Sequence, residues 1–78
     1  MENPVISGVL NVLSNHIGSL SFSIAQKSSQ DSGIKLADIN DNNISEFANA
    51  VESNTKDLIG DFPSKFLKQA IQRQVTNN

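Results

Sequence analysis

The sequence predicts an all-α protein with a long N-terminal helix and two shorter helices, arranged as a helical hairpin or small bundle. Apolar residues in the first third of the chain recur at the three- and four-residue spacing of a helix face. Two later stretches repeat that spacing, and turn-forming residues separate them. The chain also has no cysteine, so disulfides contribute nothing to its stability.

The chain is small, and its size bears on how it is stabilised. A single domain of 78 residues buries only about 60% of its unfolded surface, so most such domains use disulfides, a metal or a partner subunit. Disulfides are excluded, and His16 is the single histidine, so a zinc site is not expected. We therefore expect oligomerisation to complete the fold.

The first helix is expected over residues 4–29, because Asn3 can cap it and Pro4 suits its first turn. Six apolar residues then follow at alternating spacings of four and three, and we call them the apolar stripe: Ile6, Leu10, Leu13, Ile17, Leu20 and Ile24. Gly33 marks the end of the polar segment that follows. Gly8 and Gly18 each weaken the helix by up to about 1 kcal/mol, so its stability must come from packing.

The sequence leaves open what covers the apolar stripe. It is either the core face of a helical hairpin within one chain or a contact between several copies. Four serines run beside it every seven residues (Ser7, Ser14, Ser21 and Ser28), and their small side chains would let another helix approach closely. No charged residue occurs from Asn3 to Gln26, so no charged pair selects a particular partner. The six stripe residues are therefore the predicted interface.

A membrane-spanning role for the first helix is possible but not favoured. The stretch is long enough to cross a bilayer, yet Asn11, Asn15, His16 and five serines make it too polar for a typical span. No basic segment precedes the apolar run, which does not fit a secretory signal. A cytoplasmic location is the expectation.

The second half begins with a polar linker over residues 30–42, whose Ile34, Leu36 and Ile39 are expected to cover one end of the core. A second helix is expected over residues 43–59, where Asn43 and Glu46 resemble a capping box. Its predicted apolar face comprises Ile44, Phe47, Ala48, Val51, Leu58 and Ile59.

A third helix is expected over residues 62–76, with Gly60 as the stop before it, Asp61 as its cap and Pro63 in its first turn. Its predicted apolar face comprises Phe62, Phe66, Leu67, Ala70, Ile71 and Val75. Alternatively, the second and third helices run on through residues 60–63 with a kink. Three cations (Lys65, Lys68 and Arg73) lie toward the C-terminal part of this helix, where its dipole favours positive charge.

No catalytic, cofactor-binding or metal-ligating residue is predicted. Residues 38–47 resemble a calcium loop, but its sixth and twelfth positions hold Asn43 and Asn49 instead of Gly and Glu. The sequence contains no phosphate-binding loop, and a lone histidine without a nearby acid is weak evidence for catalysis. A net charge of −2 argues against nucleic-acid binding. His16 is a candidate pH sensor, because its protonation would loosen a packed stripe.

One segment resembles the R-body structural proteins, also called the killing-trait family. Ala50-Val51, eight further residues and then Gly60-Asp61-Phe62-Pro63 are similar to a short stretch of that family, and Gln69, Gln72 and Gln74 resemble its Gln-rich end. The run His16-Ile17-Gly18, with Phe22, Ala25, Gln26 and Gln30, is similar to a second stretch, although the two occur in the opposite order. Ser64-Lys65-Phe66 replaces the family's alanine-rich segment.

The resemblance implies a self-assembling subunit of a coiled ribbon in a bacterial cytoplasm, one that extends on acidification and can rupture membranes. The leading functional hypothesis is accordingly a non-enzymatic structural or self-assembling protein, such as an R-body-like subunit, that forms homo-oligomers through helix–helix contacts. A second hypothesis is an adaptor or regulator that lends its apolar helix to another helical protein. A third is a membrane-active helical protein.

Overall fold

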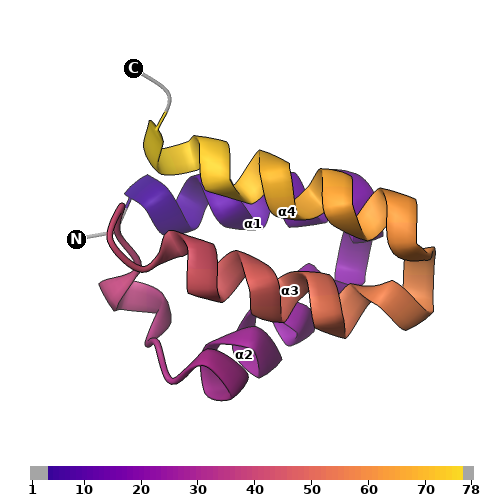
Figure 1. Cartoon of the computed structure of the whole chain (residues 1–78), viewed down its shortest axis with the longest axis horizontal. Helices are drawn as coiled ribbons and strands as arrows, with labels where there is room; N and C mark the ends of the chain where they lie inside the picture. Colours follow the sequence, from indigo (N-terminus) through magenta and orange to yellow (C-terminus); the bar gives the residue numbers. More distant parts are fainter. Residues whose placement is uncertain (1–3, 77–78) are drawn as a thin grey trace.

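The computed structural model describes residues 4–76, with side chains from Val5 to Gln74. It confirms the all-α prediction, with a long N-terminal helical stretch packed in a small bundle of 32 × 26 × 21 Å (Figure 1). In chain order the elements are α1 (Pro4–Ile17), the 3₁₀ turn η1 (Gly18–Leu20), α2 (Ser21–Ser32), the 3₁₀ turn η2 (Leu36–Asp38), α3 (Ile44–Ile59) and α4 (Asp61–Thr76).

The N-terminal stretch is helical from Val5 to Ser32, but it is bent at η1. Gly18 has a φ of 60°, a left-handed value that only glycine adopts at little cost, and this residue divides the stretch that the sequence predicts as one helix over residues 4–29. The bend gives each half its own neighbour: α1 lies against α4, and α2 lies against α3 (Figure 1).

The turn between α3 and α4 is made by a single residue, Gly60. Its backbone has φ 89° and ψ 172°, its N–H donates to the Lys56 carbonyl at 2.9 Å, and its carbonyl accepts from the Ser64 N–H at 3.2 Å. Gly60 therefore ends one helix and begins the next. The two helices fold back on each other as a hairpin, so the alternative of a continuous kinked helix is wrong.

The start of α3 differs from the predicted capping box. Asn43 occupies the position before the helix, but its side chain makes no capping hydrogen bond. Its Oδ1 instead accepts from the Asn40 N–H at 2.8 Å, and its Nδ2 donates to the Asp38 carbonyl at 3.1 Å. Asn43 thus stabilises the preceding turn and leaves the first N–H groups of α3 without a side-chain cap.

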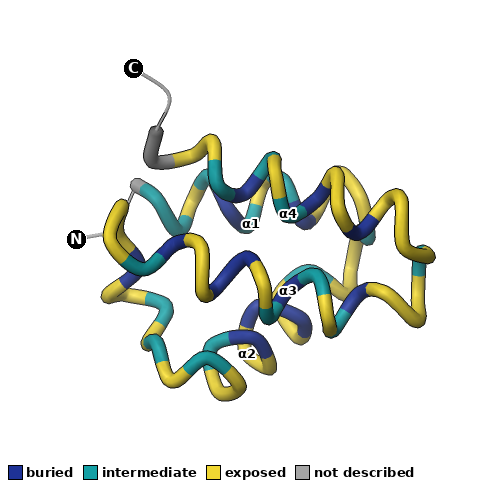
Figure 2. The backbone as a smooth tube through the Cα atoms, viewed as in Figure 1, coloured by how far each residue is buried: buried dark blue, intermediate teal, exposed yellow. Residues whose placement is uncertain are grey.

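The core lies between all four α-helices and the linker (Figure 2). Its buried apolar residues are Val9, Leu13, Ile24, Ala25, Ile39, Ile44, Phe47, Ala48, Val51, Leu67 and Ile71. Ile39 is buried, and Ile34 and Leu36 pack against the core, which confirms that the linker covers it. The accessible surface of 4848 Å² is close to the roughly 4600 Å² typical of a compact monomer of this mass. A single copy therefore closes its own core, and oligomerisation stays a prediction.

Candidate interaction surface

The apolar stripe does not present one continuous surface. Leu13 and Ile24 are buried in the core of the single chain. Ile6, Leu10 and Ile17 are partly buried and pack against that core, whereas Leu20 is 47% exposed beside the bend. A contact between copies that used all six residues would require the bundle to open. As an interface the stripe stays a prediction, and in one copy most of it serves as core.

The serine column is likewise divided by the bend. Ser7 and Ser14 are exposed on α1, whereas Ser28 is fully buried between α2 and α3. The Asn54 Nδ2 of α3 donates to Ser28 Oγ and to Asp31 Oδ2, both at 3.1 Å. Ser28 is small enough to fit there, and this polar contact joins α2 to α3.

The largest departure from the predicted side-chain pattern is on α4. Leu67 and Ile71 are fully buried, as predicted, but Phe62 and Phe66 are 79% and 64% exposed. Successive helix residues are about 100° apart, so Phe66 cannot share a narrow face with its neighbour Leu67. The prediction that both phenylalanines belong to the core face is wrong, and Val75 lies outside the described side chains.

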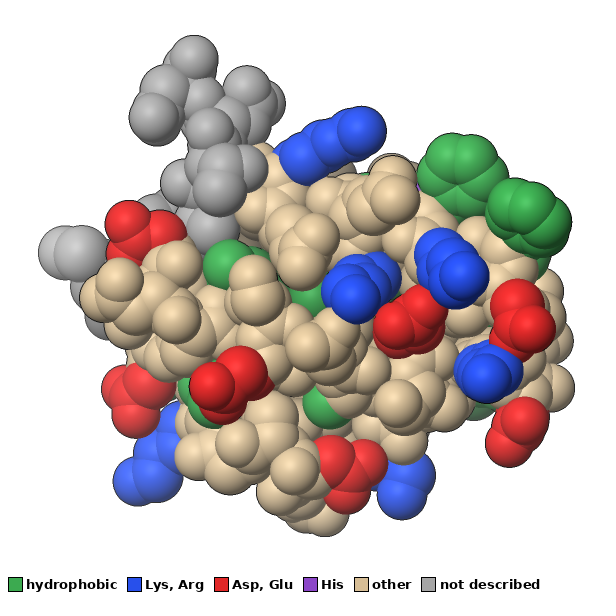
Figure 3. Space-filling view, viewed as in Figure 1, with side chains coloured by type: hydrophobic (Ala, Val, Ile, Leu, Met, Phe, Trp, Pro, Cys, Tyr) green, Lys and Arg blue, Asp and Glu red, His purple; other side chains and the backbone are tan. Residues whose placement is uncertain are grey.

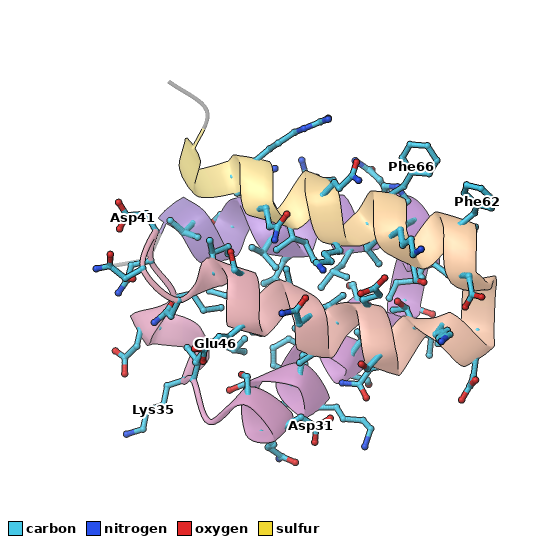
Figure 4. The ribbon with its side chains drawn as sticks, in the orientation of Figure 1. Asp31, Lys35, Asp41, Glu46, Phe62 and Phe66 are labelled. Carbon is cyan, nitrogen blue, oxygen red and sulfur yellow. The ribbon has the colours of Figure 1, made fainter. Side chains whose placement is uncertain are left out.

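The exposed side of α4 forms a defined surface, which we call the α4 outer face: Phe62, Lys65, Phe66, Gln69 and Arg73. The other four residues follow Phe62 by three, four, seven and eleven positions, so all five lie in one stripe along the helix. The two rings project from the bundle at one end of α4 (Figure 4), and they form the green patch at the upper right of Figure 3. Phe62, Lys65, Phe66 and Gln69 line a hollow of about 130 Å³.

Charged side chains of both signs lie on and beside the α4 outer face. Lys68 points toward α3, where its Nζ lies 3.7 Å from Glu52 Oε1. At the α3–α4 turn, Lys56 Nζ lies 3.6 Å from Asp61 Oδ1, and both side chains are more than half exposed. Lys65 and Arg73 are exposed on the outer face itself. The surface therefore combines two aromatic rings with two cations, and the Asp61 carboxylate lies at its N-terminal edge.

Among the side chains of residues 5–74, three other large apolar ones are exposed: Leu20, Phe22 and Leu58. Leu58 lies in the last turn of α3, and Leu20 lies in the bend between α1 and α2. The α3–α4 turn and the bend both occur toward the right-hand end of the molecule in Figure 1. Leu20 and Leu58 thus lie toward the end of the bundle where α4 begins.

Three other surface hollows are lined largely by residues with polar side chains. One, of about 470 Å³, is lined by Asp31, Ser32, Glu46, Asn49, Ala50 and Ser53. Asp31 and Glu46 come from different helices (Figure 4), but within residues 4–76 no group of three acidic or imidazole side chains is placed to hold a metal. The segment that resembles a calcium loop is instead closed by amide–backbone hydrogen bonds, such as Asn42 N–H to Asn40 Oδ1 at 2.8 Å.

His16 does not lie in a packed contact. Its ring is exposed near the end of α1, and its Nδ1 lies 2.9 Å from the Val12 carbonyl, to which it can donate a hydrogen bond. The ring lies outside the buried core. The structure therefore offers no support for His16 as a switch of the apolar stripe.

The helical stretch Val5–Ser32 satisfies a length and composition criterion for crossing a membrane. Core helices of soluble proteins and signal sequences near an N-terminus satisfy the same criterion. Here the stretch is bent at Gly18 and supplies Val9, Leu13 and Ile24 to the core, while only 11% of its apolar window is buried.

Comparison with known proteins found no matching family model, curated protein or solved structure. The R-body resemblance thus rests on its own few residues. Within them, Gly60 provides the left-handed turn and Pro63 lies in the first turn of α4, so the structure gives this pattern a local role. Sequence reasoning missed the outer face, although Phe62 and Phe66 lie on the opposite side of a helical projection from Leu67 and Ile71.

Proposed function

We propose that this chain is a non-enzymatic helical protein that self-associates through helix–helix contacts, and that α4 provides the contact surface. The observation that carries the proposal is the exposure of Phe62 and Phe66 side by side on a helix whose other face is well packed. Our sequence prediction assigned the contact to the apolar stripe. The proposal moves it to the α4 outer face because the stripe is largely occupied within one chain.

Exposed phenylalanines are unfavourable in water and favourable at an interface. A buried aromatic side chain removes about 150–250 Å² from solvent, so the exposed parts of these two rings amount to roughly 200–350 Å². Such a patch approaches the roughly 300–600 Å² of the largest apolar patch on a typical monomer, which is often functional. Phenylalanine is also enriched in protein interfaces, whereas acidic residues are depleted there. These properties favour a protein partner that supplies an apolar surface.

The R-body resemblance favours assembly over a single foreign partner. If the kinship holds, the Gly60–Pro63 corner would present Phe62 at the start of α4 in every copy of a polymer. The alternative is an adaptor that offers the same two rings to a different helical protein. Nothing in the charge pattern selects a foreign partner, which is why self-association is the leading proposal.

The test is the mass of the purified chain in solution as a function of concentration. We expect the weight-average mass by sedimentation equilibrium to rise above that of one chain of 8.4 kDa as the concentration reaches the high micromolar range. Phe66→Ser should remove the rise, whereas Phe22→Ser, a matched exposed phenylalanine on α2, should leave it. A stable monomer at all concentrations would contradict self-association, and capture of one dominant cellular protein would then favour the adaptor.

A further inference from the structure

We infer that two copies of this chain pair through antiparallel α4 helices about a two-fold axis that passes midway between Phe62 and Phe66. The inference rests on the proposed self-association and adds its geometry. Such a contact is isologous, meaning that the same surface is used by both copies. Its partner is a second copy of this chain.

The spacing of the two rings suits this pairing. In an antiparallel pair centred between positions 62 and 66, Phe62 of one copy lies opposite Phe66 of the other. By symmetry, Phe66 of the first copy lies opposite Phe62 of the second. Each copy also carries the hollow of about 130 Å³ between its rings and the side chains of Lys65 and Gln69. A ring that projects from one copy can therefore enter the hollow of the other, as knobs enter holes in packed helices.

Charge favours the antiparallel direction. Asp61 and Lys65 are four residues apart on either side of the proposed axis. In the antiparallel pair, Lys65 of one copy comes within about one helical turn of Asp61 in the other, and the symmetry makes this contact twice. The antiparallel register offsets the two Lys65 side chains by only two residues, about 3 Å along the axis, but a parallel pair would place Lys65 directly opposite Lys65 and Asp61 directly opposite Asp61.

Asp61 is available for this contact even though it already has a partner. Its 3.6 Å pair with Lys56 is formed between side chains that are 68% and 60% exposed. Exposed pairs of this kind contribute little, because water and salt screen them. Asp61 can therefore interact with Lys65 of the other copy, whether its ion pair with Lys56 is kept or lost.

The area of the surface indicates the strength of the dimer. A stable dimer typically buries about 800 Å² per partner, and the two rings supply roughly 200–350 Å² of it. Asp61, Lys65, Gln69 and Arg73 add a polar rim, and Leu58 is exposed in the last turn of α3, before the Gly60 hairpin. The two rings alone fall short of that area, so we expect a weak dimer that forms and separates with concentration.

A membrane is the less favoured occupant of the same surface. Two rings and Lys65 could contact an anionic bilayer, but Asp57 and Asp61 lie at the same end of the molecule and the chain carries a net charge of −2. These carboxylates offset the attraction of Lys65 and Arg73 for negative lipid headgroups. A second copy instead pairs Asp61 with a cation.

The experiment is a charge-reversal cycle in the full chain. Lys65→Glu and Asp61→Lys should each raise the dimer dissociation constant about tenfold or more, because each creates two like-charge contacts across the axis. The double variant D61K/K65E should recover to within a few-fold of the original, because the charges are exchanged but still complementary. Lys35→Glu, an exposed cation before η2, is the matched control and should change nothing.

The possible outcomes distinguish a failure of the antiparallel pairing from a failure of self-association through α4. Circular dichroism and thermal melting of every variant establish that it is folded before its mass is compared. If Phe66→Ser abolishes the dimer but the double variant is weaker than both single variants, self-association stands and the antiparallel pairing is overturned. If Phe66→Ser leaves the dimer intact, the α4 outer face is not the interface. If the chain stays monomeric yet sediments with phosphatidylglycerol vesicles, a lipid surface replaces the second copy.

Discussion

The two faces of α4 carry similar residues in opposite surroundings. Leu67 and Ile71 face α1 and α3 and are fully buried, whereas Phe62 and Phe66 face outward and are mostly exposed. Both pairs have the four-residue spacing of a helix face. The difference shows that this spacing identifies stripes on a helix, while the position of the neighbouring helices decides which stripe is core.

The largest expected difference in the free energy of unfolding is between substitutions at two adjacent residues of α4. Leu67→Ala should lower the free energy of unfolding by about 2–5 kcal/mol, because it leaves a cavity in a closed core. Phe66→Ala should change it by no more than about 0.5 kcal/mol, because an exposed ring has few contacts to lose. Urea denaturation of both variants at low protein concentration measures the difference. Similar losses in both would show that Phe66 is packed in solution.

The same contrast occurs within the apolar stripe. Leu13→Ala should cost about 2–5 kcal/mol, enough to unfold much of a marginally stable domain. Leu20→Ala should cost no more than about 1 kcal/mol, because nearly half of that side chain is already in water. Thermal melting of the two variants checks this. An equally large loss for Leu20 would mean that a partner covers it.

The bend can be tested with the two glycines of the N-terminal stretch. Gly18→Ala should destabilise the chain by about 1–2 kcal/mol, because alanine is strained at a φ of 60°. Gly8→Ala lies inside α1, where alanine favours the helix, and the added methyl meets only the flexible end of the Gln74 side chain. We expect little change or a small gain there. A gain at position 18 instead would indicate a straight helix in solution.

The polar contact between α2 and α3 should have a smaller effect. Asn54→Ala removes the donor to Ser28 Oγ, a hydrogen bond typically worth about 0.5–1.5 kcal/mol. Asn49→Ala, an exposed position on the same helix, is the control. Denaturation midpoints of the two variants provide the comparison, and equal midpoints would show that the contact does not hold α2 in place.

The smallest expected effect concerns the ion pair that links α4 to α3. Lys68→Met keeps the aliphatic stem of the side chain but removes the charge 3.7 Å from Glu52. The loss should be about 0.2–1 kcal/mol and should shrink at high salt, because partly exposed pairs are screened. Denaturation at low and high ionic strength measures this loss of stability. A loss that does not depend on salt would contradict the prediction.

Much of the fold could be predicted because local chemistry specifies it. The breaks at Gly33 and Gly60 depend on left-handed backbone, which glycine adopts readily, and the helix between them follows its own apolar spacing from Ile44 to Ile59. The bend at Gly18 was harder to foresee, because a glycine inside an apolar repeat is compatible with a continuous helix.

The candidate surface could not be located from spacing alone. Phe62, Phe66, Leu67 and Ile71 are all apolar, and sequence interpretation placed them on a single face. A helical projection separates the two pairs, but it does not say which pair meets α1 and α3. The hairpin at Gly60 decides this, since it sets the side of α4 that faces the bundle.

The sequence by itself determined that this chain is helical, that its helices break at Gly33 and Gly60 and that no cysteine stabilises it, because these properties follow from residues and their near neighbours. Only the tertiary structure decided that Leu13 and Ile24 serve as core and that Phe62 and Phe66 stay exposed. Burial depends on segments that are distant in sequence and meet only after the bend and the hairpin have formed.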